Sequence, residues 1–316
     1  MSDAQAGAAP THYPFILGII GDSGSGKSTV ADGVRALIGP ERVTSLELDD
    51  YHRYTRAERV ELGLTALNPT VHNLPLMQEH LQLLRRGRPV RNRRYDHSDG
   101  TFGPIRTLDP NEVVIARGLL GFPSEELRSA YDLAVFLQPE PELLFRWKLR
   151  RDVKTRGYSE AEVLKRIAQH LLDSKQYVLP QADRADLVVR YRIPEWDAPD
   201  SEVSAELVLR RAAAEAVRGN GVLPRFENDV RVEDGEGEGG ELTLHVPPGL
   251  DTGKVEEWAR DLFAETHHAG SLGAFMDDDG GTRPSPPIAF TQVLIADLTQ
   301  KLRRRAGAAR EAAVAV

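Results

Sequence analysis

The sequence predicts an α/β fold of the P-loop type, in which helices flank a parallel sheet and a C-terminal α+β extension follows. The first observation is the stretch GDSGSGKST at 21–29, which matches G-x-x-x-x-G-K-[ST] and stands between an apolar run at 14–20 and a helically spaced pattern at 30–38. The second is the alternation of further apolar runs with helical patterns, which is typical of a parallel sheet covered on both faces. The third is a change to shorter, mixed patterns after Pro194.

The glycine-rich stretch predicts a phosphate-binding loop. Its glycines allow a tight turn whose N–H groups point at a phosphate, and the helix that follows adds a partial positive charge at its N-terminus. Lys27 can reach the β- and γ-phosphates of a nucleotide, and Ser28 can hold Mg²⁺. We therefore expect nucleotide binding by all nine residues of the loop: Gly21, Asp22, Ser23, Gly24, Ser25, Gly26, Lys27, Ser28 and Thr29.

The remaining elements of the core follow in order. Short apolar runs predict strands at 43–48, 112–117, 132–137 and 187–191. Capping and stop signals predict helices at 74–86, at 140–156 and from 159 to about 177. Asp49 directly follows the second strand, at the edge where open α/β sheets bind ligands. The Arg-rich segment 85–94 and the segment 94–103 are expected to be loops, which form either a solvated face or a surface that attracts anions.

Composition sets the limits of the prediction. The 316 residues allow one large or two modest domains, and 41% hydrophobic residues suffice for a core. The formal net charge of −8 argues against nucleic acid as a partner. The absence of cysteine excludes disulfides, a Cys-ligated zinc site and thiol redox control. We find no apolar run of membrane-spanning length and no secretion signal in 1–10, and therefore expect no membrane partner and a cytoplasmic protein.

The predicted organisation is a core at 13–194, an extension at 195–305 that packs on it, and flexible termini at 1–12 and 306–316. In the extension we expect three short strands, two amphipathic helices and an acidic, Gly-rich turn. Their ranges are 204–210, 230–232 and 242–246 for the strands, 252–267 and 289–305 for the helices, and 233–240 for the turn.

Several motifs together resemble the phosphoribulokinase and uridine kinase family. They follow the phosphate loop in the family's order and approximate spacing, from about 15 to 192: DDYHRY-x-R at 49–56, YDH at 95–97, WKLRRD at 147–152 and RG at 156–157. The phosphoribulokinase branch fits better than the uridine branch. The signs of that branch are His52, Arg56, Arg151, Arg156, the run YVLPQ at 177–181 and the tail segments 258–267 and 288–293.

This resemblance implies a P-loop kinase fold and an ATP- and Mg²⁺-dependent kinase. The acceptor would be a small sugar phosphate, and we expect ribulose 5-phosphate to give the 1,5-bisphosphate; a homo-oligomer is compatible with the family. Asp49 would be the general base, Lys27 and Lys148 would contact the phosphates in transfer, and Ser28 with Asp152 would lie at the metal. The resemblance assigns substrate binding to six residues: His52, Arg56, Tyr95, His97, Arg151 and Arg156.

The chemistry of these residue types agrees with the implied activity. Phosphoryl transfer needs a phosphate cradle, a metal, cations and a carboxylate near the nucleophile, and guanidinium groups suit a phosphorylated acceptor. Arg151 and Arg156 point about 140° apart on an ideal helix. Either one serves the nucleotide and the other the acceptor, or the helix ends between them.

One position departs from the family pattern. Where the family has a carboxylate followed by Gly-Leu-His at the end of the third strand, this chain has Arg117-Gly118-Leu119-Leu120. A cation about 4 Å from Mg²⁺ would repel it by several kcal/mol at an intermediate dielectric. Three accounts are open: Arg117 points at phosphates while Asp49, Asp50 or Asp152 serves the metal, the protein binds nucleotide with little turnover, or the alignment is shifted by one residue.

Other functions and simpler roles also remain open. A uridine-type nucleoside kinase would need aromatic rings around a base, and a catalytically weakened nucleotide-binding protein is suggested by Arg117. Asp49 can cap a turn or pair with an arginine, and Lys148 can belong to a solvated helix face. His52 can be a hydrogen-bonded loop residue, while Tyr95 and His97 can order their own turn. The aromatic residues available for a base are Tyr51, Tyr54, Tyr95 and Phe102.

Overall fold

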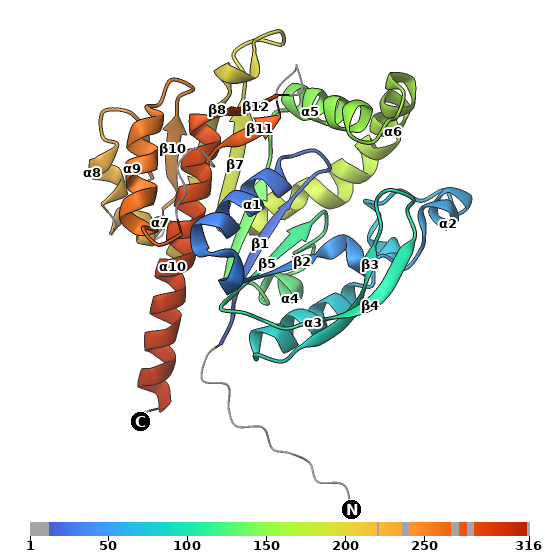
Figure 1. Ribbon diagram of the computed structural model, residues 1–316, viewed down its shortest axis with the longest axis horizontal. Helices are drawn as coiled ribbons and strands as arrows, with labels where there is room; N and C mark the ends of the chain where they lie inside the picture. Colours follow the sequence, from blue (N-terminus) through green and yellow to red (C-terminus); the bar gives the residue numbers. More distant parts are fainter. Residues whose placement is uncertain (1–12, 220, 236–239, 267–271, 277–280, 315–316) are drawn as a thin grey trace, which may run out of the picture.

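The computed structural model describes residues 13–219, 221–235, 240–266, 272–276 and 281–314. One sheet of eight strands organises the chain, in the order β2-β5-β1-β6-β7-β8-β10-β9 (Figure 1). Its first five strands are parallel: β2 (Val43–Glu47), β5 (Val113–Gly118), β1 (Phe15–Gly21), β6 (Leu133–Leu137) and β7 (Leu187–Arg192). The last three are antiparallel: β8 (Ser204–Leu209), β10 (Leu242–Val246) and β9 (Arg231–Asp234). The predicted α/β fold with a parallel core is therefore confirmed, and the extension continues the same sheet.

Both faces of the sheet are buried because successive strand residues point to opposite sides. In β1, Phe15, Leu17 and Ile19 belong to one apolar cluster, while Ile16 and Ile20 belong to the other. The first cluster is covered by α1 (Lys27–Ile38), α7 (Arg211–Arg218), α9 (Thr252–Leu262) and α10 (Pro286–Val314). The second is covered by α3 (Leu74–Arg85) and α4 (Glu125–Arg128).

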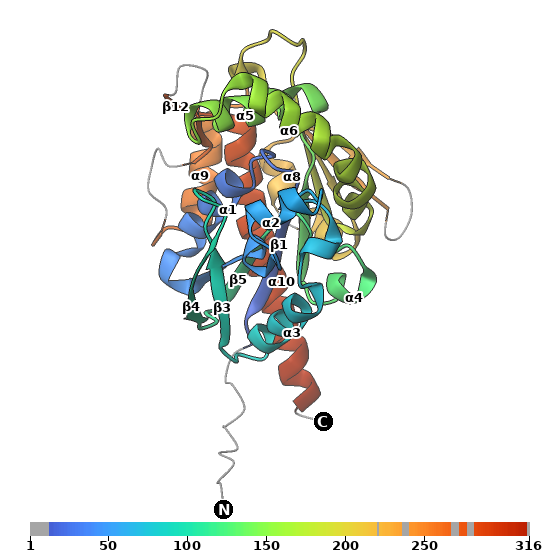
Figure 2. The ribbon, with the colours of Figure 1, turned by 90° about the vertical axis from the view of Figure 1, so that its right-hand side faces the viewer.

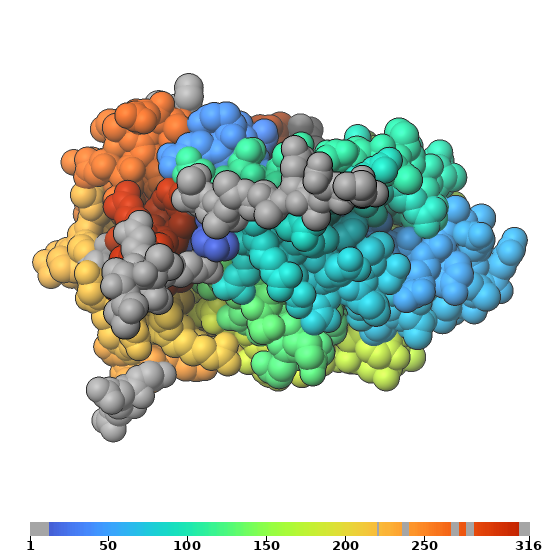
Figure 3. All heavy atoms as spheres, turned by 90° about the horizontal axis from the view of Figure 1, so that it is seen from below, coloured from blue at the N-terminus to red at the C-terminus, as the bar shows by residue number. Residues whose placement is uncertain are grey.

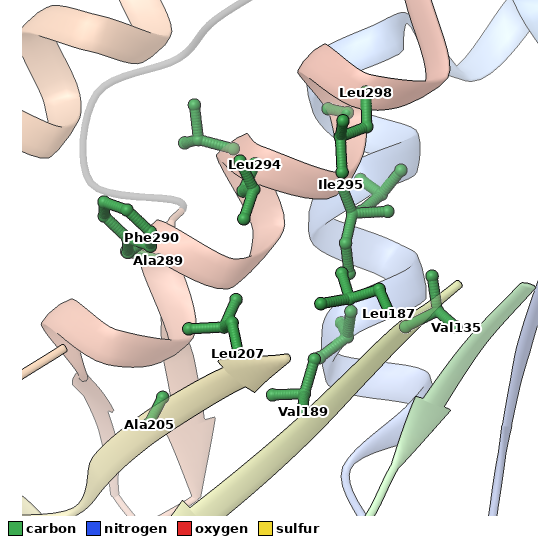
Figure 4. Packing of buried hydrophobic residues seen from close by; sticks show 14 of the residues in the cluster. Val135, Leu187, Val189, Ala205, Leu207, Ala289, Phe290, Leu294, Ile295 and Leu298 are labelled. Carbon is green, nitrogen blue, oxygen red and sulfur yellow. The ribbon is translucent and has the colours of Figure 1, made fainter. Parts of the chain in front are cut away.

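The extension is joined to the core through the first of these clusters. Figure 4 shows Phe290, Leu294 and Ile295 of α10 above the core strands and β8. Figure 3 shows the extension, yellow to red, lying against the blue-to-green core. Two further helices, α5 (Pro141–Lys154) and α6 (Glu160–Asp173), stand together above the carboxyl ends of the parallel strands (Figures 1 and 2). None of the helices in the described ranges is both long and apolar enough to cross a membrane.

The shorter elements complete the chain. Two separate hairpins form from β3 (Val90–Tyr95) with β4 (Phe102–Leu108) and from β11 (Ala274–Met276) with β12 (Thr282–Pro284). The remaining helices are α2 (Arg56–Glu61), α8 (Val222–Arg225), and the 3-10 turns η1 (Pro40–Arg42), η2 (Leu48–Tyr51), η3 (Pro69–Val71), η5 (Leu179–Arg184) and η6 (Asp200–Glu202). A π-helical turn, η4 (Ser174–Val178), follows α6.

Two local expectations were wrong. Much of the segment 85–103 is not a loop, because it forms part of the β3–β4 hairpin, in which Val90, Asn92 and Tyr95 are buried between exposed arginines. The helix expected to run to about 177 is an α-helix only to Asp173 and continues as a π turn to Val178. The Ala-rich end belongs to α10, which extends to Val314, and alanine is a good helix former. The predicted flexible arm 1–12 lies outside the described residues, as do 236–239 of the acidic turn.

Candidate active site

A cleft of about 1070 Å³ opens at the carboxyl edge of the parallel strands. In open α/β sheets this edge is where ligands bind. The phosphate loop and the start of α1 form its floor, η2 and β3 form one wall, and α5 and α6 form the other. The cleft therefore joins segments that are far apart in the sequence, and most of the predicted site residues line it.

The phosphate loop has the backbone that its sequence predicts. Gly24 and Gly26 both have φ +88°, a left-handed conformation that favours glycine. The Nζ of Lys27 donates to the carbonyl oxygens of Gly21 at 2.9 Å and Asp22 at 2.7 Å, so that the ammonium group lies across its own loop. Burial lowers the pKa of Lys27 to about 8, although Asp49 opposes this shift. An anion bound in the loop would replace the lost solvation of this cation.

Asp49 follows β2 in η2 and faces the same cleft as Lys27. Its Oδ2 lies 3.2 Å from Nε2 of His97, whereas its Oδ1 is enclosed and has no hydrogen-bond partner among the described residues. Burial alone would raise the pKa of this carboxyl, but the hydrogen bond from His97 holds the pKa well below its usual range. The ionised carboxylate lines the cleft with its side chain 22% exposed, and its Oδ1 is not used by any described residue, which suits a proton acceptor or a metal ligand.

A stack of histidines and Tyr95 forms the wall beside Asp49. The His52 ring lies 4.4 Å from that of His72 and 4.8 Å from that of Tyr95, and the His97 ring lies 5.1 Å from that of Tyr95. The Tyr95 hydroxyl accepts a hydrogen bond of 2.8 Å from the buried guanidinium of Arg59. Burial, and after it His72, lowers the pKa of His52 to about 3. His52 is therefore a neutral ring at physiological pH.

Two arginines, one in α5 and one just beyond it, pair with the same carboxylate. Asp152 is 3% exposed and accepts from Arg151 at 2.8 Å and from Arg156 at 3.2 Å. Because α5 ends at Lys154, Arg156 lies beyond the helix. The helix therefore ends between Arg151 and Arg156, which is one of the two alternatives left open by the sequence. Arg151 also donates to Oγ of Ser23 in the phosphate loop at 3.0 Å.

Two further cations lie nearby: Arg56 lines the cleft, whereas Lys148 is buried beside the phosphate loop. Lys148 is 7% exposed, and burial lowers its pKa. Lys148 packs against the phosphate loop, since a Cβ added at Gly24 would lie 3.1 Å from the Cβ of Lys148. On the opposite side, Arg56 donates to the carbonyl oxygen of His97 at 2.5 Å. Cationic groups thus line the cleft from both sides.

The comparisons with known proteins agree with this arrangement. The model of the "Phosphoribulokinase / Uridine kinase family" matches residues 16–198, more than half of the chain. The chain belongs to this family. Its P-loop kinase core is thus that of the phosphoribulokinase/uridine kinase family, as the motifs predicted, and the family uses ATP.

Individual relatives show how far the similarity extends. A phosphoribulokinase of Synechocystis sp. is 35% identical over 175 residues, which are 55% of this chain and 53% of that protein. The chloroplastic phosphoribulokinase of Spinacia oleracea is 28% identical over 221 residues, which are 65% and 55% of the two chains. A uridine kinase of Deinococcus deserti is 29% identical over 180 residues, covering 56% of this chain and 87% of that one. The chain spans about half the length of the phosphoribulokinases it matches.

A solved structure shows the same fold beyond the family core. The phosphoribulokinase from Rhodobacter spheroides superposes with a TM-score of 0.60 at 18% sequence identity, covering 80% of this chain and 97% of that one. This likeness concerns the fold. It includes a larger part of the chain than the 16–198 match, and so reaches into the extension.

Arg117 is the residue at which this chain departs from the family pattern, and its guanidinium group is paired with two carboxylates. Its Nε donates to Oε1 of Glu47 at 2.7 Å, and its Nη1 donates to Oδ1 of Asp32 at 3.0 Å. Glu47 and Arg117 are register partners on the neighbouring strands β2 and β5. Burial raises the pKa of the Glu47 carboxyl, and Arg117 opposes that shift. The positive charge at the end of β5 thus faces a carboxylate at the end of β2.

No group of three potential metal-ligating His, Cys, Asp or Glu residues occurs in the part of the chain that the structure describes. The donors that line the cleft still fit a hard divalent cation, because Ser28, Glu47 and Asp49 supply oxygen ligands. Mg²⁺ commonly binds through one or two protein oxygens together with substrate phosphates. Asp152, assigned to the metal by resemblance, accepts hydrogen bonds from two guanidinium groups.

Sequence reasoning did not single out Glu47, Arg59 or His72. A glutamate at the end of an apolar strand is a local signal that was available for Glu47. No local signal marks His72 or Arg59, because their contacts with His52 and Tyr95 cross long stretches of the chain. Gln181, quoted in the family motif, has a structural contact: its Oε1 accepts from the backbone N–H groups of Gly121 and Phe122 at 3.0 Å each, which anchors the loop after β5.

Proposed function

We propose that this chain is an ATP-dependent kinase that phosphorylates ribulose 5-phosphate to the 1,5-bisphosphate. The observation that carries the proposal is the carboxylate of Asp49, which lines the same cleft as the phosphate loop and Lys27 and whose Oδ1 has no hydrogen-bond partner among the described residues. A carboxylate with one unused acceptor atom near a phosphate cradle is what an incoming hydroxyl group needs.

The proposed reaction uses Asp49 for the acceptor and the phosphate loop for the nucleotide. Asp49 accepts the proton of the acceptor hydroxyl while that oxygen forms a bond to the γ-phosphorus. The bond from the γ-phosphorus to the bridging oxygen of the β-phosphate breaks, and ADP leaves. Lys27 and Lys148 balance the charge of the phosphoryl group, and His97 orients Asp49 through its hydrogen bond. Mg²⁺, when bound by Ser28 with Glu47 or Asp49, would neutralise phosphate charge.

The basic walls favour a phosphorylated acceptor. Arg56 and Arg156 line the cleft, and their guanidinium groups suit the 5-phosphate of a pentose phosphate. A uridine acceptor would instead need free aromatic faces. Tyr95 is already packed between His52 and His97, and the guanidinium of Arg93 lies 3.8 Å from the centroid of Phe102. These contacts favour a sugar phosphate over a nucleoside as the acceptor.

The deciding experiment measures ADP release with ribulose 5-phosphate, ribose 5-phosphate and uridine as acceptors. We expect turnover with ribulose 5-phosphate to exceed that with the other two. A response to uridine alone would reject the pentose-phosphate proposal. Tight ATP binding that is indifferent to Mg²⁺, with no turnover on any acceptor, would favour the weakened nucleotide-binding protein that Arg117 suggested.

A further inference from the structure

The end of the cleft beyond the phosphate loop is aromatic. Trp147 of α5 and Tyr191 of β7 line it from the core, with ring centroids 5.7 Å apart. Phe275 of β11 and Ile288 of α10 line it from the extension. We call these four residues the aromatic recess. Elsewhere the cleft is lined by many charged side chains together with apolar ones such as Leu64 and Leu67.

The recess lies directly beside the phosphate loop. A Cβ added at Gly26 would be 3.7 Å from Cζ3 of Trp147, so that the indole ring lies over the residue before Lys27. Figure 1 draws the β11–β12 hairpin beside α5, and Phe275 of this hairpin lines the same cleft as Trp147 and Gly26. A nucleotide whose phosphates occupy the loop would therefore meet these rings with its base.

Gln292 of α10 fixes the extension to the phosphate-loop helix. This side chain is 2% exposed, its Nε2 donates to the carbonyl oxygen of Thr29 at 2.8 Å, and its Oε1 accepts from the N–H of Gly273 at 2.8 Å. Gly33 of α1 has no room for a side chain because an added Cβ would be 2.2 Å from the Gln292 amide. The segment that leads to Phe275 is thus held at the first turn of α1.

The recess also contains a donor that lacks an acceptor. Nε1 of Trp147 is enclosed and has no hydrogen-bond partner among the described residues. An indole N–H can only donate, and leaving it unsatisfied after burial is unfavourable. A planar heteroaromatic ring would stack on the apolar surfaces of the recess, and its acceptor nitrogens would satisfy this donor once the indole turns its N–H towards the cleft.

We propose that the purine base of the bound nucleotide lies in the aromatic recess, so that the C-terminal extension forms part of the nucleotide site. Trp147 and Phe275 contact the base, and Gln292 is a positioning residue that holds the extension against α1. This inference rests on the nucleotide-binding half of the proposed function and is independent of the acceptor. It gives the extension a role that the family match at 16–198 does not include.

The test compares ATP with inorganic tripolyphosphate, which carries the same number of phosphates but no base. Calorimetry on the full chain should show that Phe275→Ala raises the Kd for ATP about 10-fold, while the Kd for tripolyphosphate stays within about twofold. Phe275→Tyr should restore ATP affinity because it restores the ring. Trp196→Ala is the matched control, since Trp196 is 54% exposed and lies outside the recess.

A second readout uses the indole itself. ATP should change the tryptophan fluorescence of the wild type, and Trp147→Phe should remove most of that change while Trp196→Phe retains it. The inference is overturned if Phe275→Ala weakens ATP and tripolyphosphate equally, or weakens neither. It stands if the base-dependent difference is present but no pentose phosphate is phosphorylated, in which case the proposed acceptor fails alone.

Discussion

The ion pair between Glu47 and Arg117 makes a quantitative prediction. Two unit charges about 4 Å apart attract by about 4 kcal/mol at an effective dielectric constant of 20. Screening reduces this value here, because the Arg117 side chain is 22% exposed and that of Glu47 is 35% exposed. We therefore expect a coupling free energy of about 1 to 2 kcal/mol between the two side chains.

A double-mutant cycle measures this coupling. The variants are Arg117→Met, Glu47→Gln and the combination of both, and the measured quantity is the free energy of unfolding in urea. Each single variant should lose stability, and the double variant should lose less than the sum. Asp32→Asn is the matched control: the Asp32 side chain is 68% exposed, so its contact with Arg117 should contribute less than about 0.5 kcal/mol.

The sign of the electrostatics can be tested with Arg117→Glu. This change places two carboxylates at the ends of neighbouring strands and should destabilise the protein more than Arg117→Met does. Adding Glu47→Gln should recover most of the loss. Since Arg117 is already paired, we expect no rise in turnover from Arg117→Glu. A coupling free energy within about 0.3 kcal/mol of zero, or higher activity in Arg117→Glu, would refute the view that the pair compensates its own charge.

Other predictions concern the remaining titratable groups. Asp49→Asn should lower kcat about 100-fold or more with ATP affinity unchanged, measured by ADP release and calorimetry, as expected for loss of a general base; retained turnover would remove Asp49 from the mechanism. ATP should raise the Lys27 pKa from about 8, so that binding at pH 8 takes up about half a proton. Calorimetry in buffers of different ionisation enthalpy measures this proton uptake, and Lys27→Met should abolish it. Folding lowers the His52 pKa from 6.5 to about 3, so the unfolded chain binds more protons than the folded one between these pH values. The stabilisation present above pH 6.5 should therefore be lost as the pH falls towards 3. From this group the free energy of unfolding should change by about 1.4 kcal/mol per pH unit in that range. His52→Gln should flatten that slope in urea unfolding at pH 4 to 7, and an unchanged slope would contradict the assignment.

Local patterns were sufficient to predict the frame of the molecule. The strand, loop and helix at 15–38 were predicted because periodicity, glycine spacing and the helix start are all written in adjacent residues. The β3–β4 hairpin was missed because arginine fills its exposed positions, so that charge hid the alternation with Val90, Asn92 and Tyr95. The full extent of α10 was missed because an Ala-rich end has no apolar face to mark it.

The site was predictable only where a motif names its residues. Asp49, Lys27 and Lys148 stand in motifs, and all three belong to the region around the phosphate loop in the structure. The partner of Arg117 was not predictable, because the Glu47 contact depends on the register of two strands that are distant in the sequence. The recess formed by Trp147 and Phe275 depends likewise on the packing of the extension.

The charges around the cleft explain how an arginine can replace an acid at the strand end. At the end of β5 the positive charge of Arg117 is balanced by Glu47 on the adjacent strand, so a carboxylate remains at the same edge of the sheet. Lys27, Lys148 and Arg151 are held close to the loop at the expense of their hydration, and the pKa values of both lysines are lowered by burial. A polyanionic triphosphate relieves that cost, whereas a neutral ligand does not. These buried cations therefore favour a polyphosphate at the loop, and in the proposed reaction Asp49 is then left for the acceptor.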